Sequence, residues 1–159
     1  GNSIETLRVL MFEAARSKSR ELFETASERF RRHAEAAWDW VYGGLYPCLN
    51  NVQRNDWDMA KILRVQEEAL TGTLFVIEHT GAVWAKELFG KVYSYVREKF
   101  TMKQYGYPLW MLAADRKVSF EPHSNRVDIY YHPRHLMFNL LSLDRMLSRG
   151  GKVSNLFGV

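Results

Sequence analysis

Apolar residues recur at every third or fourth position along most of the chain, and this period constrains the fold more than any other feature. Stripes of this kind predict helices over roughly 3–17 and roughly 19–39, the second with a charged opposite face. Two more stripes, from Met59 to Ile77 and from Ala85 to Val96, predict a third and a fourth helix. The chain is therefore expected to be all-α and built from helical hairpins.

Glycines and prolines separate these stripes. Gly43-Gly44 is expected to break the second helix, and Thr80-Gly81 to end the third. Pro133 suits a first helical position and predicts a fifth helix that runs to Gly150-Gly151. About five helices in this order match a repeating array of hairpins, in which each unit buries a face against its neighbours.

Residues 101–131 differ from the rest of the chain. Gly106, Pro108 and Pro122 separate short aromatic and β-branched pieces, among them residues 127–131. These signals predict a long loop with strand-like arms. Loops of this length often carry function.

Composition excludes several classes of protein. With 159 residues, 47% of them hydrophobic, the chain has the size and core of one domain, and a disordered chain is excluded. The net charge of +4 comes from basic residues interleaved with acidic ones, so no nucleic-acid partner is expected. No run approaches the ~18 apolar residues of a membrane span, and no Cys/His cluster indicates a metal. The lone Cys48 and a start without signal-peptide features predict a cytoplasmic protein.

Four segments, taken in order, resemble the N-acylglucosamine 2-epimerase superfamily, which includes cellobiose 2-epimerases and mannose isomerases. Residues 1–5 resemble its Gly-His-x-Ile-Glu, and residues 42–46 resemble its Gly-Gly-Leu-Phe turn. Residues 61–70 are similar to Lys-x-Trp-Trp-x-Gln-x-Glu-Ala-Leu, and residues 131–134 look like an ending of the His-x-x-Arg type. The order and spacing of the four segments make the match more specific than any one of them.

The resemblance implies a barrel of six inner and six outer helices. Residues 1–159 would be a single domain, the C-terminal part of this (α/α)6 barrel, with the first, third and fifth helices inner and the other two outer. The resemblance also implies a reaction that removes the C2 proton of an aldose and returns it to the opposite face or to C1. Two histidines act as acid and base, and no metal or other cofactor is required.

The same resemblance implies roles for residues at the starts of the inner helices. His132 would be the catalytic acid/base, and its expected N-cap position, where the helix dipole disfavours imidazolium, predicts a lowered pKa. Arg134 would contact sugar hydroxyls or the developing enediolate oxygen. The other expected substrate contacts are Glu68, Gln66, Glu5, Asn2 and Trp110.

Asn2 is the main departure from the family pattern. It stands where the family has its other histidine, and an amide does not exchange protons near neutral pH. Leu63-Arg64 likewise replace the paired tryptophans. An isomerase or epimerase is still the leading interpretation, with impaired or altered activity expected.

Simpler structural roles stay open for these residues. Asn2 and Glu5 have the spacing of a capping box, and His132 could cap its own helix. Arg134 and Glu68 could be solvated or ion-paired, and Trp110 could belong to the core. The other histidines match no family position, namely His33, His79, His123 and His135.

The alternatives for the whole chain belong to other functional classes. One is a non-catalytic carbohydrate-binding or assembly module on the same scaffold, and a more distant one is a helical-repeat interaction domain. About five helices cannot close a twelve-helix barrel, so the apolar faces of the first and last helices are expected to lie open. The expected partners are therefore a monosaccharide or disaccharide, and either the N-terminal half of the barrel or a second copy of the chain.

Overall fold

The computed structural model describes residues 2–102, 107–112 and 130–157, and helices dominate them. Within these residues the five α-helices are α1 (Asn2–Arg16), α2 (Arg20–Ala37), α3 (Leu63–Thr80), α4 (Val83–Lys99) and α5 (Tyr131–Ser148). The predicted all-α class and helical-hairpin order are confirmed. The described helices do not form a closed barrel.

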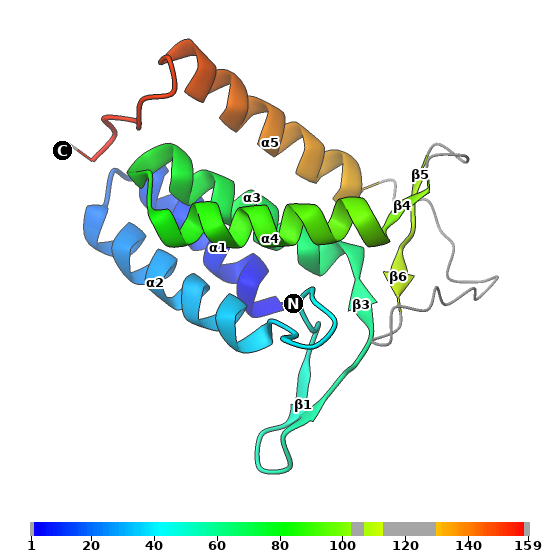
Figure 1. Ribbon diagram of the computed structural model, residues 1–159. Helices are drawn as coiled ribbons and strands as arrows, with labels where there is room; N and C mark the ends of the chain where they lie inside the picture. The colour runs from blue at the N-terminus through cyan, green and yellow to red at the C-terminus, as the bar shows by residue number, and fades with distance from the viewer. Residues whose placement is uncertain (1, 103–106, 113–129, 158–159) are drawn as a thin grey trace.

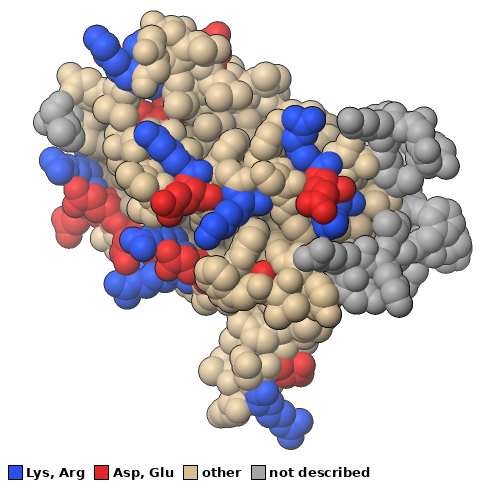
Figure 2. Space-filling view, in the orientation of Figure 1, with Lys and Arg blue, Asp and Glu red and all other residues tan. Residues whose placement is uncertain are grey.

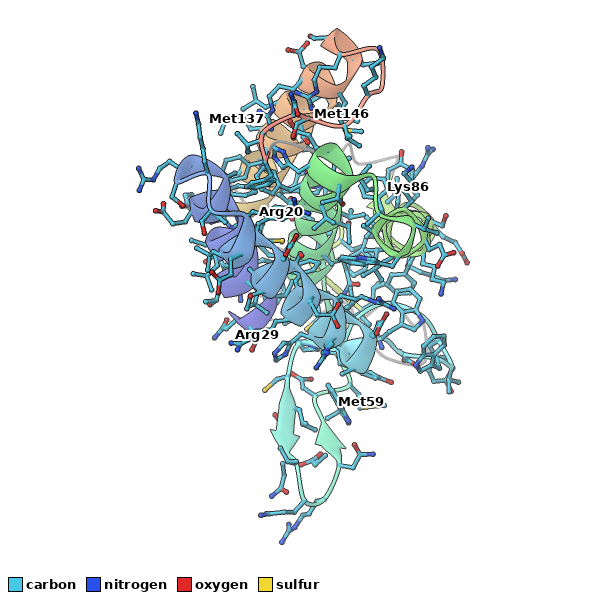
Figure 3. All side chains as sticks on the ribbon, turned by 90° about the vertical axis from the view of Figure 1, so that its left-hand side faces the viewer. Arg20, Arg29, Met59, Lys86, Met137 and Met146 are labelled. Atoms are coloured by element: carbon cyan, nitrogen blue, oxygen red, sulfur yellow. The ribbon has the colours of Figure 1, made fainter. Side chains whose placement is uncertain are left out.

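The helix α3 lies at the centre of the fold and contacts α1, α4 and α5 (Figure 1). The helix α2 packs mainly on α1, and α4 packs on α3, so α1, α3 and α5 form one row and α2 and α4 a second (Figure 1). A perpendicular view, which labels Lys86 on α4 and Met137 and Met146 on α5, shows α4 and α5 on different sides of α3 (Figure 3). The predicted inner and outer rows are therefore present.

The core is built from the apolar stripes of α1 and α2 and from almost the whole of α3. Fourteen of the residues of α3, from Leu63 to Glu78, are buried. At Gly72 the ring of Phe30 lies only 2.4 Å from the position that a Cβ atom would take. A glycine is thus required where α2 approaches the backbone of α3.

The helix α3 begins later than the sequence stripe indicates. The stripe starts at Met59, but Lys61–Ile62 forms the strand β3, which pairs antiparallel with β6 (Met111–Leu112). The prediction of a helix from Met59 is therefore wrong. Apolar spacing could not reveal this boundary, because the pairing partner lies about 50 residues further along the chain.

Short strands flank the helices. A hairpin joins β1 (Leu49–Asn51) and β2 (Asp56–Trp57), and β4 (Thr101–Met102) pairs with β5 (Tyr107–Pro108). Together with β6, the last pair confirms the strand-like arms in the described part of the predicted loop. Residues 113–129, which include Pro122 and His123, lie outside the described residues.

The turn after α2 is fixed by a buried ion pair. Gly43 and Gly44 have positive φ angles of 79° and 78°, as the predicted glycine break requires. Asp39 accepts hydrogen bonds from the backbone N–H groups of residues 41 and 42, and from Nζ of Lys61 at 2.7 Å. Burial alone would raise the pKa of Asp39, but these hydrogen bonds hold it at about 2.

The helix α5 begins at Tyr131, two residues before the predicted start. Only Ser142 of this helix is buried, while Leu136, Leu140, Leu143 and Leu147 are between 43% and 78% exposed. Figure 2 shows few charged side chains over α5, whereas charges gather over α2 at the lower left. The expected open apolar face is present on α5, and on α1 Val9 and Leu10 are also exposed.

None of the helices in the described part of the chain is both long and apolar enough to cross a membrane.

Candidate functional site

Five charged residues from the first two turns of α1, α3 and α5 form one alternating chain of ion pairs. Glu5 accepts from Nη1 of Arg64 at 3.1 Å and from Nη2 of Arg134 at 3.2 Å. Arg134 also donates to Glu68, whose other oxygen accepts from Nε of Arg8. The structure therefore brings together three of the expected site residues, Glu5, Glu68 and Arg134, at one end of the helix bundle. We call this set the charge cluster.

Burial changes along the charge cluster. The side chains of Arg8 and Glu68 are 4% and 8% exposed, whereas those of Arg64 and Glu5 are 28% and 25% exposed. Arg134 lies between these two ends and over the ring of Tyr131, at 4.9 Å from its centroid. Burial opposes its charge, but Glu68 and Glu5 raise the pKa of Arg134 above its ordinary value.

His132 contacts a different carboxylate. Its Nδ1 atom lies against Oε1 of Glu67, a side chain that is only 4% exposed, while His132 itself is 30% exposed. Because α5 begins at Tyr131, His132 is the second residue of the helix and not its N-cap. The predicted capping position is therefore wrong, although His132 still lies in the first turn, close to the positive end of the helix dipole.

His132 and Arg134 occupy two sides of α5. Residues two apart on a helix are separated by about 200° around its axis, so their side chains do not face each other. His132 lines a cavity of about 440 Å³ between α3, α4 and α5, and Arg134 is not among the described residues that line it. Most of the lining is apolar, for example Leu70, Phe89 and Leu140.

His135, one turn after His132, lines the same cavity. Its Nδ1 atom is 2.8 Å from Oγ1 of Thr71, and Nδ2 of Asn139 is 3.3 Å from its ring nitrogens. Burial, with the charge of His132 as a smaller cause, lowers the pKa of His135 to about 4. The ring is therefore neutral near pH 7.

The remaining expected site residues lie elsewhere. Gln66 is buried, and its amide accepts from the backbone N–H of Leu45 at 2.8 Å and donates to the carbonyl of Leu45 at 2.9 Å. This pair of bonds holds the glycine turn and leaves Gln66 outside the charge cluster. Asn2 is the exposed first residue of α1, and Trp110 is half-buried, with its carbonyl accepting from Leu63 at 2.9 Å.

Helix spacing could have found two of the residues that were not expected at the site, Arg8 and His135. Arg8 lies one turn after Glu5 in the same helix, whereas Glu67 directly precedes Glu68 and has no such spacing signal. His135 lies one turn after His132, on the same face. The capping box does not form as expected, because Asn2 is already helical and the carboxylate of Glu5 accepts from two guanidinium groups.

A second ionic group holds the far ends of α3 and α5 together. Glu78, 1% exposed, accepts from Ser142 at 2.5 Å, from Arg145 at 2.6 Å and from Arg149 at 3.1 Å. Burial would raise the pKa of Glu78, but these donors hold it at about 2. No group of three or more metal-ligating side chains occurs within the described ranges.

The geometry supports two kinds of chemistry at the helix starts. Carboxylates and guanidinium groups that converge from three helices can hydrogen-bond several hydroxyls of one ligand. An imidazole whose Nδ1 is held by a carboxylate can take up or release a proton at its other nitrogen.

Comparison with known proteins places these features in a family. The family model of N-acylglucosamine 2-epimerase (GlcNAc 2-epimerase) matches residues 1–135. No curated protein matches the chain at a significant level. Among solved structures, a D-mannose isomerase superposes with a TM-score of 0.72 and 15% sequence identity over 94% of this chain.

Two further solved structures show the same fold. A cellobiose 2-epimerase from Spirochaeta thermophila DSM 6192 gives a TM-score of 0.69 at 16% identity over 92% of this chain. A sugar epimerase from a ruminal bacterium gives a TM-score of 0.64 at 18% identity over 96%. The chain covers 36% of the length of the D-mannose isomerase structure and 38% of each of the other two.

Proposed function

The chain belongs to the N-acylglucosamine 2-epimerase family, and on that premise we propose that it forms part of the active site of a sugar 2-epimerase or aldose–ketose isomerase. The observation that carries the proposal is the charge cluster, because it gathers polar groups from the starts of α1, α3 and α5 at one end of the bundle. A cytoplasmic location, predicted from Cys48, belongs to the same proposal.

His132 is the proposed acid/base. In this proposal Nδ1–H of His132 donates a hydrogen bond to Glu67, which leaves Nε2 of the neutral ring as the nitrogen that takes the C2 proton. The C2–H bond breaks, the N–H bond forms, and the electron pair moves toward C1 to give an enediolate. Return of a proton to the other face of C2 gives the epimer, and return to C1 gives the ketose.

Arg134, Glu68 and Glu5 are the proposed sugar contacts. Each is ion-paired in the structure, so a sugar hydroxyl would replace or share one of the existing hydrogen bonds. The guanidinium of Arg134 can stabilise the negative charge that develops on the enediolate oxygen. Since Arg134 and His132 flank the first turn of α5, the sugar would lie across that turn.

Epimerisation needs a second acid/base on the opposite face of the sugar, and Asn2 cannot supply it. We propose that this group, and further sugar contacts, come from a covering partner. The partner is either the N-terminal half of the barrel or a second copy of the chain. The exposed leucines of α5 support such a partner, because a contiguous apolar face of this kind is usually covered.

The alternative function is a non-catalytic carbohydrate-binding or assembly module on the same scaffold. Two observations favour it. Asn2 replaces a histidine of the family pattern, and the acids and bases of the charge cluster are paired with one another.

Exchange of the C2 proton separates the two functions. A panel of aldoses and N-acylated aminosugars is incubated with the protein in deuterated water, and deuterium at C2 is followed by NMR. We expect exchange that is lost in His132→Ala and retained in His33→Ala, a matched change of an exposed histidine on α2. Saturable sugar binding without exchange would instead establish the binding module.

A further inference from the structure

The charge cluster holds an odd number of charges. It alternates strictly from Arg64 through Glu5, Arg134 and Glu68 to Arg8, so three guanidinium groups meet two carboxylates. Partly buried charges are stable when they are paired, and a positive charge in excess therefore favours an anion beside the cluster. Glu67, the next carboxylate along α3, does not supply it, because Glu67 contacts His132.

We infer that the sugar bound at this site carries an anionic group, a phosphate, sulfonate or carboxylate, which Arg64 binds. This inference rests on the proposed function and deepens it by naming the class of sugar.

The two ends of the charge cluster differ in what they can accept. At one end Arg8 is 4% exposed and lies over the rings of Phe12 and Phe138, at 5.0 and 5.6 Å from their centroids. An added anion would have to be fully dehydrated to reach it, and the rings occupy the space. The excess charge is therefore not neutralised at the Arg8 end.

At the other end Arg64 is 28% exposed and reaches the surface. Its hydrogen bond to Glu5 at 3.1 Å uses one of the five N–H donors of the guanidinium, and the group stacks over Tyr131 at 4.8 Å. Stacking fixes the guanidinium plane and leaves its edges for hydrogen bonding. Donors on one planar fork suit the two or three oxygens of a phosphate, sulfonate or carboxylate.

The position of Arg64 also suits one end of a sugar. Arg64 and Arg134 both donate to Glu5, from α3 and α5 respectively, so the two guanidinium groups are neighbours. An anionic group on Arg64 leaves Arg134 and Glu68 to contact the hydroxyls. Among the residues that the structure describes, no further carboxylate is paired with the cluster, so a neutral sugar would leave its excess positive charge without an anionic partner.

Matched neutral and anionic sugars test the inference. Binding of glucose and mannose is compared with that of their 6-phosphates by calorimetry at low salt, with inorganic phosphate and sulfate as competitors. We expect the 6-phosphates to bind at least about tenfold more tightly, and the advantage to shrink as salt screens the contact. The affinity advantage of the 6-phosphates should fall to about twofold or less in Arg64→Gln. Part of this advantage should remain in Arg64→Lys, which keeps the positive charge.

Arg20→Gln is the matched control, because it removes a guanidinium from an exposed ion pair on α2. Circular dichroism of each variant confirms the fold. Equal affinity for neutral and phosphorylated sugars, or a preference that survives in Arg64→Gln, would overturn the inference and leave the proposed function standing. A preference that depends on Arg64 without C2 exchange would support the inference and overturn the catalytic proposal. Failure of both kinds of sugar to bind would overturn the inference as well.

Discussion

The carboxylate of Glu67 contacts Nδ1 of His132 and belongs to a side chain that is only 4% exposed. This contact joins the central helix α3 to the first turn of α5. A buried carboxylate in this place orients the imidazole, selects its tautomer and stabilises its protonated form.

Glu67→Gln tests this role of the carboxylate. The amide keeps the size of the side chain but removes its charge, so we expect C2 exchange to slow by about 10- to 100-fold. The acidic limb of the pH–rate profile should move to lower pH, because the imidazolium loses its counter-charge. NMR exchange rates measured across pH check both effects. Glu87→Gln, an exposed change on α4, is the control, and an unshifted profile in Glu67→Gln would show that the contact is only structural.

Lys61→Met tests the ion pair behind the glycine turn. Lys61 is fully buried against Asp39, with Nζ also 3.6 Å from the ring centroid of Tyr46. Loss of the ammonium leaves the carboxylate buried and uncompensated, which should lower the free energy of unfolding by about 3–5 kcal/mol. Urea unfolding measures the change, and the double variant Lys61→Met/Asp39→Asn should recover part of it. A loss of less than about 1 kcal/mol in the single variant would contradict the prediction.

Gly72→Ala tests the close approach of α2 to α3. The added methyl group would meet the ring of Phe30, so we expect a loss of about 1–3 kcal/mol in the free energy of unfolding. The matched control is Gly90→Ala in α4, where no atom lies within 4 Å of the new Cβ. There the change should stabilise the helix by about 0.5–1 kcal/mol, because alanine restricts the unfolded chain. Equal effects at the two glycines would show that Phe30 does not limit residue 72.

Acid should weaken the fold before the carboxylates titrate. The pKa of His135 falls from 6.5 to about 4 on folding, and burial also lowers that of His79. Between pH 6.5 and about pH 4 the unfolded chain binds more protons than the folded one. The contribution of His135 to the free energy of unfolding is therefore complete above about pH 6.5 and is lost as the pH falls toward 4. Urea unfolding at several pH values measures the slope. His135→Gln should flatten it, and an unchanged slope would assign the effect to other groups.

Local periodicity predicted the helices, apart from the start of α3, whereas the inner and outer rows were implied by the family resemblance. The stripes of α1 and α2 lie within two residues of the observed bounds, and Gly43-Gly44 adopts the positive φ that breaks α2. The stripes and the glycine break depend on neighbours within about one turn of the chain. Three members of the charge cluster, Glu5, Glu68 and Arg134, were expected at the site from the family resemblance, although their partners lie far along the chain.

What the sequence did not reveal depends on partners far along the chain. The pairing of β3 with β6 moves the start of α3, and Glu67 meets a histidine 65 residues away. Gln66 was expected to contact substrate, yet both its amide atoms bond to Leu45. The side of α3 on which each polar residue lies is decided by packing, and adjacent residues such as Gln66, Glu67 and Glu68 have three different partners.

Polar pairs recur at three heights between α3 and α5, namely Glu67 with His132, Thr71 with His135, and Glu78 with Ser142. Each of these hydrogen bonds joins a residue of α3 to a residue of α5 at a particular height, so the three pairs together help to set the axial position of α5. The axial position of α5 is therefore encoded independently of whatever covers its leucines. Substitutions at these exposed leucines can change the covering partner over evolution without displacing the first turn that carries His132 and Arg134.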